Sequence, residues 1–210
     1  MSQGSHSENP KLPATQRGRR SRAAIVDAAA SMIYQRGVGA TSLDDVLAEA
    51  GCGKSQLYHY FDGKSDLVQA VIERQLEMIL AAQPEIELVD SWAGLRRWAD
   101  QIIAAHSVPG GPFACPLGSI AAELKNDAAF VPSLDRAFSR WEQFLSDGLQ
   151  KMHDRGQLRR SAQPQRLARS LMAALQGGML LARIHGDVKI LQDSVDSALA
   201  GVRSKAAPKH

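Results

Sequence analysis

The sequence has few of the features that mark secreted, membrane-spanning or metal-binding proteins. It contains only two cysteines, Cys52 and Cys115, and neither lies in a CxxC pair or beside a histidine cluster. We therefore expect no disulfide framework and no zinc site, and the expected compartment is the reducing cytoplasm. No apolar run approaches the ~20 residues that span a bilayer, and no apolar segment follows the first charges as in a signal peptide, so no membrane partner is expected.

The patterns of common catalytic sites are also absent. The histidines are scattered, the acidic residues form no constrained pair, and no glycine-rich phosphate loop or nucleophile elbow follows a strand. We expect no enzyme, no catalytic residue, no metal and no cofactor. Aromatic residues make up 5% of the chain and the formal net charge is only +3, so total composition does not identify a nucleic-acid partner by itself.

What the sequence does contain is apolar residues at helical spacing along nearly its whole length, with hardly any strand signals. It therefore predicts an all-α fold. Glycines and prolines supply the breaks between helices. A first helix that includes Ile25 should stop near Gly37, and the later ones should cover residues 43–50, 54–61, 66–82, 92–107, 117–124, 132–156, 165–184 and 188–203.

Two of these segments, 43–50 and 54–61, are short and are joined by a glycine-rich turn at residues 51–53. Two short helices joined in this way under a preceding helix are typical of a helix-turn-helix, whose second helix can lie in the major groove of DNA. Hydroxyl side chains at residues 41–42, followed three positions later by acids, mark the start of the first short helix. The spacing alone is not specific, because helical hairpins occur in all-α proteins of many functions.

The outward residues of segment 54–61 have side chains that suit DNA. Lys54 supplies a cation, Ser55 a small hydroxyl, and Gln56 an amide whose donor and acceptor can pair with adenine. Tyr58 and His59 can hydrogen-bond to phosphate oxygens, which positions a helix without reading sequence. A further phosphate site, formed with the free amides at the start of the next helix, includes Lys64.

The strings TSLDDVLAEAG at residues 41–51, KSQLYHYF at 54–61 and KSDL at 64–67 closely resemble the N-terminal domain of the TetR family of repressors. The resemblance runs over roughly residues 20–70 without a gap. It implies base contacts from Lys54, Ser55 and Gln56. The family commonly has Tyr-Tyr-His-Phe where this chain has Tyr-His-Tyr-Phe, so His59 stands where a second tyrosine is frequent. The phosphate contacts that the resemblance implies are made by Ser42, Tyr58, His59 and Lys64.

The C-terminal part carries a second resemblance. CPLGS at residues 115–119, AAEL at 121–124 and QGG at 176–178 are similar to the branch of the family that includes the LmrA and YxaF multidrug-related repressors. This resemblance implies a dimeric, ligand-responsive C-terminal domain, without identifying the ligand.

We expect three parts in the chain: a flexible basic arm at residues 1–20, a three-helix DNA-binding domain at 21–66, and a larger ligand-binding and dimerisation domain at 67–210. The arm can reach DNA phosphates or a minor groove, or serve only as a solubilising tail before Thr15. The basic residues that cluster in and just after it are Lys11, Arg17, Arg19, Arg20 and Arg22.

Gly177 and Gly178 lie in the middle of an expected helix, where each glycine costs ~1 kcal/mol relative to alanine. Close approach of a partner helix would offset this cost. We therefore expect segments 165–184 and 188–203 of each subunit to form a four-helix dimer interface, the alternative being that they pack only within the monomer. A two-fold dimer reads an inverted repeat.

Aromatic side chains in the C-terminal part can supply the apolar walls of a ligand chamber, although each can also be ordinary core. His106 can alternatively face solvent at a helix C-terminus. The candidates, of which all but Trp98 form the expected ligand-binding set, are Trp92, Trp98, His106, Phe113, Phe138, Trp141, Phe144 and Met179.

The sequence therefore predicts a homodimeric repressor of transcription that binds double-stranded operator DNA and is released by a small-molecule effector. The helix that begins near Asp66 is the expected hinge between the two domains. Two alternatives remain open: an activator or nucleoid-associated DNA-binding protein, and a thiol-responsive regulator in which oxidation of Cys115 triggers release.

Overall fold

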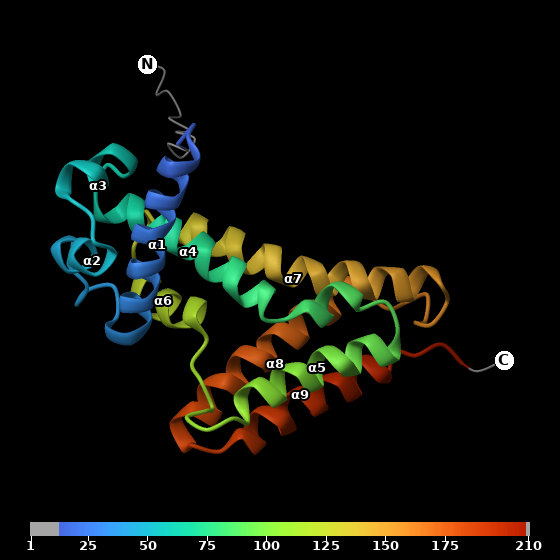
Figure 1. Cartoon of the computed structure of the whole chain (residues 1–210). Helices are drawn as coiled ribbons and strands as arrows, with labels where there is room; N and C mark the ends of the chain where they lie inside the picture. The colour runs from blue at the N-terminus through green and yellow to red at the C-terminus, as the bar shows by residue number, and fades with distance from the viewer. Residues whose placement is uncertain (1–12, 209–210) are drawn as a thin grey trace. The chain divides into compact units, whose positions relative to one another are not determined.

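A computed structural model of the chain describes residues 13–208. These residues form helices and no strand, and their one isolated bridge pairs Leu158 with Ala206. The all-α prediction is confirmed. The elements, shown in Figure 1, are α1 (Gln16–Arg36), α2 (Leu43–Ala50), α3 (Lys54–Tyr60), α4 (Lys64–Ala81), the short 3₁₀ helix η1 (Pro84–Leu88), α5 (Trp92–His106), α6 (Pro116–Leu124), α7 (Val131–Asp154), α8 (Pro164–His185) and α9 (Val188–Arg203).

The chain divides into two compact units, residues 1–74 and 75–210. The first unit holds α1, α2, α3 and the larger part of α4, and the second holds the remaining elements. The expected helix-turn-helix domain, 21–66, lies within the first unit, which continues to Arg74.

The first helix begins earlier than the sequence suggested. α1 starts at Gln16, and the hydroxyl of Thr15 caps it by accepting a hydrogen bond from the backbone N–H of Gly18 (3.1 Å). The last five residues of the expected arm are therefore helical, while residues 1–12, including Lys11, lie outside the described residues. α1 ends as expected, because Gly37 follows it with a φ of 86°.

The first unit has a small apolar core to which every one of its helices contributes. α1 packs against both α2 and α3, and an ion pair between Arg74 and Asp27 (2.6 Å) ties α4 to α1. The core fixes which face of α3 points outward. Its buried side chains include Ile25, Ala29 and Ile33 of α1, Val46 and Leu47 of α2, Leu57 and Tyr60 of α3, Phe61, and Leu67 and Val71 of α4.

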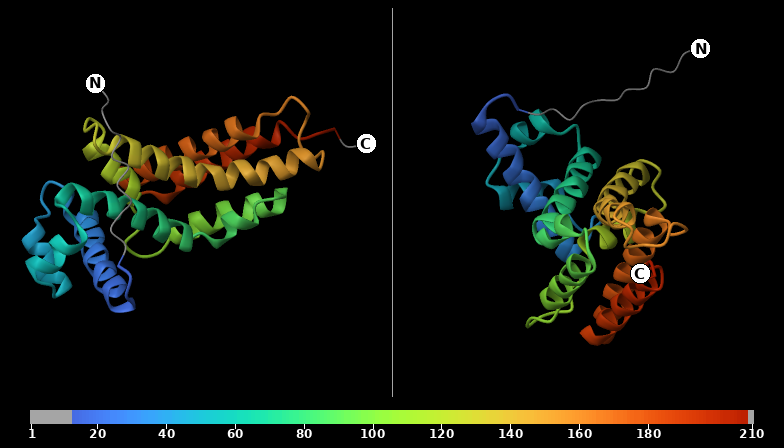
Figure 2. Two further views of the ribbon diagram at one scale, coloured as in Figure 1. Left: turned by 90° about the horizontal axis from the view of Figure 1, so that it is seen from above. Right: turned by 90° about the vertical axis from the view of Figure 1, so that its right-hand side faces the viewer.

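In the second unit, α8 lies between α7 and α9, and α5 runs beside α9 (Figures 1 and 2). Gly178 of α8 is required by this packing. A β-carbon at Gly178 would lie 3.0 Å from Cβ of Ser194 and 3.1 Å from Cδ1 of Leu191, both on α9. The close approach of a partner helix that we expected at these glycines is made, at Gly178, by α9 of the same chain, whereas Gly177 faces open space.

The other helix boundaries follow the predicted ones within a few residues, and η1 was not predicted. Gly148 of α7 lies against the turn that follows η1, since a β-carbon there would collide with the carbonyl oxygen of Val89. None of the helices in residues 13–208 is both long enough and apolar enough to span a membrane.

Candidate nucleic-acid interface

The helix-turn-helix is built from short helices whose ends are well defined. The hydroxyl of Ser42 accepts a hydrogen bond from the backbone N–H of Asp45 (3.1 Å), while the Asp45 carboxylate accepts one from the backbone N–H of Ser42, which forms a capping box. The Ser42 hydroxyl also donates a hydrogen bond to Oδ2 of Asp45 (2.7 Å), and this bond, together with the one from the Ser42 backbone N–H, lowers the pKa of Asp45. α2 ends at Gly51, whose φ of 63° is the left-handed conformation that glycine adopts without strain. The chain can therefore turn within three residues into α3.

The inner face of α3 is anchored by complete burial of Leu57, and Phe61, directly after the helix, is also fully buried. Tyr60 is 6% exposed. Since α3 has only seven residues, these contacts fix the rotation of the whole helix. The side chains left on its outer face are all polar, and they are Lys54, Ser55, Gln56, Tyr58 and His59.

Two of these outer side chains have partners within the first unit. Nζ of Lys54 lies 3.0 Å from Oδ1 of Asp44 on α2, and this pairing raises the pKa of Lys54. Both side chains are 70% exposed, so the ion pair contributes little to stability. On the other side, Nε2 of Gln56 donates a hydrogen bond to the hydroxyl of Ser21 on α1 (2.7 Å).

The expected phosphate contacts lie around the same face. Tyr58 is 58% exposed, and the ring of its neighbour His59 is exposed and meets the ring of Tyr60 edge to face at 4.9 Å. Lys64 is the first residue of α4, next to backbone N–H groups that have no partner within that helix. Ser42 is exposed but also serves as the α2 cap.

Sequence reasoning missed three residues that shape this face. Asp44 and Ser21 contact the outer side chains of α3, and the guanidinium of Arg22 stacks over the ring of Phe61 at 4.9 Å. Ser21 and Gln56 are 35 positions apart, so no local pattern connects them. The sequence pattern identified Arg22 only as one of the clustered basic residues near the N-terminus.

The expected ligand residues fall into separate groups within the second unit. His106, at the end of α5, pairs with Phe113 at a ring distance of 6.1 Å, and Phe138 stacks on Trp141 at 6.5 Å. Trp141 is 1% exposed, and its Nε1 is buried with no hydrogen-bond partner among the described residues. The other two residues on α7 and α8 are Phe144, half-buried, and Met179, 4% exposed.

Trp92 lies apart from the other expected ligand residues, in a groove between α5 and α9. The guanidinium of Arg203 stacks over its ring at 4.6 Å, and both residues line this groove, which has a volume of about 480 Å³. Trp98 is fully buried and its Nε1 donates to Oε1 of Gln83 (3.3 Å), as in ordinary core.

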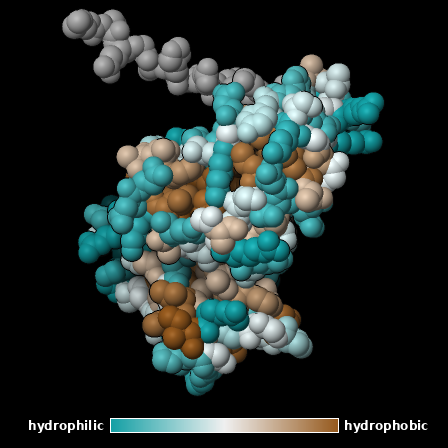
Figure 3. Space-filling view, turned by 90° about the vertical axis from the view of Figure 1, so that its left-hand side faces the viewer, coloured by the Kyte–Doolittle hydropathy of each residue, from teal (hydrophilic) through white to brown (hydrophobic). Residues whose placement is uncertain are grey.

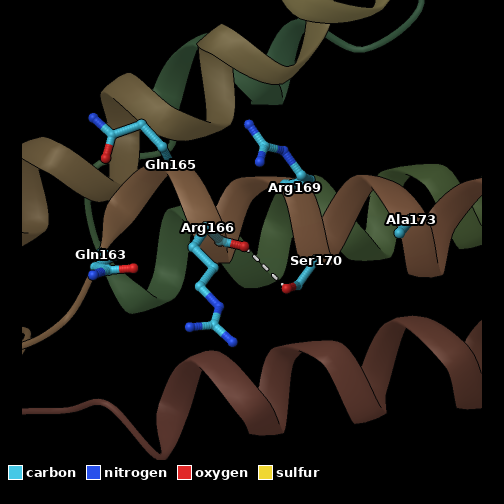
Figure 4. A pocket seen from close by; sticks show the side chains of 6 residues that line it. All are labelled: Gln163, Gln165, Arg166, Arg169, Ser170 and Ala173. Atoms are coloured by element: carbon cyan, nitrogen blue, oxygen red, sulfur yellow. Dashed lines mark hydrogen bonds between the residues drawn. The ribbon is translucent and has the colours of Figure 1, made fainter.

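A wider hollow of about 750 Å³ lies beside the first turns of α8, where Arg166 and Arg169 project from the helix and Ser170 bonds back to the Arg166 carbonyl oxygen (2.9 Å) (Figure 4). It is open to solvent and lined mostly by polar residues, and none of the expected ligand residues lines it. We assign no effector to it.

Cys115 is 8% exposed and caps the start of α6, where its Sγ accepts a hydrogen bond from the backbone N–H of Gly118 (3.3 Å). Burial raises the pKa of its thiol. Because the thiolate is the reactive form, this environment opposes the thiol-responsive alternative.

Two family models match the chain. Residues 25–71 match the model described as "Bacterial regulatory proteins, tetR family", and residues 92–198 match the "Tetracyclin repressor-like, C-terminal domain". The second match alone covers just over half of the chain. The first match includes every residue of the outer face of α3.

Individual proteins that are similar to this chain are also named as HTH-type transcriptional regulators. An uncharacterized HTH-type transcriptional regulator of the lacX 3' region of Lactococcus lactis subsp. lactis is 28% identical over 180 residues, which is 82% of this chain and 88% of that protein. HTH-type transcriptional regulator TtgR of Pseudomonas putida is 40% identical over 52 residues, 25% of each chain.

Among solved structures, reduced Escherichia coli NemR matches with a TM-score of 0.77 and 22% identity, over 90% of this chain and all of that one. A regulator from Cytophaga hutchinsonii also gives a TM-score of 0.77, with 18% identity over 94% of this chain and all of that one. At these identities the two structures establish the fold.

Proposed function

Because this chain belongs to the TetR family of bacterial regulatory proteins, we propose that it is a repressor that binds an inverted-repeat operator as a homodimer and leaves it when a small molecule binds to its second unit. The chain is a helix-turn-helix transcriptional regulator that binds DNA and not an enzyme. The observation that carries the proposal is the polar outer face of α3 above an inner face anchored by Leu57 and Phe61.

In the proposed complex, α3 lies in the major groove. Lys54, Ser55 and Gln56 come from its first turn, the part of a recognition helix that contacts base edges. The residues that hold phosphates fix the position of the helix; they are Ser42, Tyr58, His59 and Lys64. The regulator acts in the cytoplasm, where its operator is.

The homodimer is supported by the surface of α8. One side of α8 packs against α7 and α9, yet Leu180, Leu181 and Ile184 are 60%, 47% and 66% exposed. Gly177 lies three and four positions before the first two of these, so all four share one side of the helix. Figure 3 shows one face of the molecule, on which hydrophobic side chains lie among hydrophilic ones. A second copy of α8 and α9 would cover it in a four-helix interface.

An effector site between α7 and its neighbours in the second unit is supported by the stacked pair of Phe138 and Trp141. The buried Nε1 of Trp141 could donate to an acceptor atom of an otherwise apolar molecule. The remaining candidates in the second unit are Trp92, His106, Phe113, Phe144 and Met179.

Release requires that the effector prefer the conformation with the wrong separation of the two α3 helices. Half-sites one helical turn apart require the two α3 helices to lie ~34–36 Å apart. A change of a few ångströms in this separation therefore moves one α3 helix out of its half-site. α4 is the proposed hinge, because the division between the two units falls within this helix, after Arg74.

The test is selection of bound sequences from a random duplex pool by the full-length chain, repeated with Tyr58→Ala and Lys64→Ala. The wild type should enrich an inverted repeat. Both variants should bind it more weakly with unchanged base preferences, and Lys64→Ala should reduce the salt slope by about 1. If the wild type enriches no sequence even at low salt, the proposal is wrong.

A further inference from the structure

The hydrogen bond between Gln56 and Ser21 links a base-reading position of α3 to α1. Nε2 of Gln56 donates to the Ser21 hydroxyl at 2.7 Å, which is ordinary hydrogen-bond length. Gln56 itself is exposed, on the outer face of α3, and Ser21 is half-buried. The contact therefore orients an exposed side chain from a more rigid neighbour.

The hydrogen bond to Ser21 affects which groups of the Gln56 amide are free to pair with a base. A glutamine amide has one acceptor oxygen and two N–H donors. Pairing with the major-groove edge of adenine uses the oxygen and one N–H, because adenine presents a donor at N6 and an acceptor at N7. The oxygen and the second N–H of Gln56 remain free for adenine when Ser21 accepts from the N–H that points away from the amide oxygen. In the structure the Nε2 end of the amide, not the oxygen, bonds to Ser21.

We propose that Ser21 is a specificity-determining positioning residue, which holds the Gln56 amide in the orientation that selects adenine at one position of each half-site. The inference rests on the proposed function, and it adds a residue of α1 to the determinants of the operator sequence. Ser21 need not touch DNA for this role.

Removal of the Ser21 hydroxyl should not move α3 itself, because other contacts hold that helix. Arg22, the next residue of α1, stacks over Phe61 just beyond the end of α3, and Leu57 in the middle of α3 is fully buried. α3 is thus held in place without Ser21. Loss of the Ser21 hydroxyl frees the Gln56 side chain, not the helix.

The experiment compares the wild type, Ser21→Ala, Ser21→Thr and Gln56→Ala in selection from a random duplex pool at several salt concentrations. A hydrogen bond of this kind is worth about 2- to 10-fold. Ser21→Ala should therefore lower the preference for adenine about 2- to 10-fold at the one position that Gln56→Ala also affects. Other positions and the salt slope should not change, and Ser21→Thr, which keeps the hydroxyl, should restore the preference.

A double variant provides the control for coupling, since Ser21→Ala should add nothing once Gln56 is alanine. Thermal unfolding of each variant checks that the fold is retained. Unchanged base preferences in Ser21→Ala would overturn the inference, and a uniform loss of affinity with those preferences unchanged would make Ser21 a phosphate contact. In both cases the wild type still selects an inverted repeat, so the proposed function stands; failure of the wild type to select any sequence would end both.

Discussion

At the scale of single residues, the exposed cation of α3 is already paired before any DNA is present. Lys54 lies 3.0 Å from Asp44, and both side chains are 70% exposed. The carboxylate of Asp44 also adds a negative charge beside the face that would meet phosphates. An exposed pair of this kind contributes little because solvent screens it, so DNA can compete for Lys54 easily.

We predict that Asp44→Asn strengthens binding to non-operator duplex by up to about 5-fold at low salt, because it removes this competing charge. Titration of a fluorescent duplex at several salt concentrations measures the change. Glu49→Gln is the matched control, since it removes the same charge from α2 and Glu49 forms no ion pair with Lys54. Weaker binding by Asp44→Asn would mean that Asp44 holds Lys54 in its productive position.

Cys115 gives a second prediction at this scale. Burial raises the pKa of its thiol, whereas Cys52, in the turn before α3, is only half-buried. In the folded protein, iodoacetamide should therefore modify Cys52 about 10-fold or more faster than Cys115, as measured by mass spectrometry over time. Equal rates in native protein would contradict this and return Cys115 to consideration as a sensor.

At the scale of elements, adjacent glycines of α8 have opposite surroundings. A methyl group at Gly178 would meet Ser194 and Leu191 of α9 at 3.0 and 3.1 Å, while one at Gly177 would meet nothing within 4 Å. The two positions share the same helix and the same propensity, so any difference between them reports packing alone.

We predict that Gly178→Ala destabilises the protein by about 1–3 kcal/mol, because the packed helices must separate. Gly177→Ala should instead be neutral or stabilising by up to about 1 kcal/mol when no second copy covers that side. Urea unfolding of both variants therefore uses a background that also carries Ile184→Glu, which removes the proposed dimer contact. A loss at Gly177 as large as at Gly178 in that background would contradict the prediction.

At the scale of the whole molecule, reading an inverted repeat depends on two copies of the chain. The exposed side of α8 is where we expect the second copy, with Ile184 66% exposed. A charge there should break the contact, because a buried unpaired carboxylate is costly.

We predict that Ile184→Glu yields a monomer near 22.7 kDa in sedimentation and binds the full inverted repeat far more weakly, while retaining weak binding to a half-site. Leu88→Glu, at a residue that is 55% exposed on η1, is the control and should leave the dimer intact. A dimeric Ile184→Glu would exclude this side of α8 as the interface.

The sequence alone determined the helical fold and the place of the helix-turn-helix. These follow from local physics: the 3.6-residue spacing of apolar side chains, the hydroxyl and acid that cap α2, and Gly51 at a left-handed turn act over a few neighbouring residues. The burial of Leu57, Tyr60 and Phe61 follows the same helical spacing.

The tertiary structure alone decided which residues meet across long stretches of chain. It brought Ser21 to Gln56, explained Gly178 by α9 of the same chain, extended α1 back to Gln16, and placed Trp92 beside Arg203, apart from the other expected ligand residues. No local pattern encodes such contacts, because they depend on how whole helices pack. Packing is set by the burial of many side chains together, and the partners of one side chain follow from it only after the core has formed.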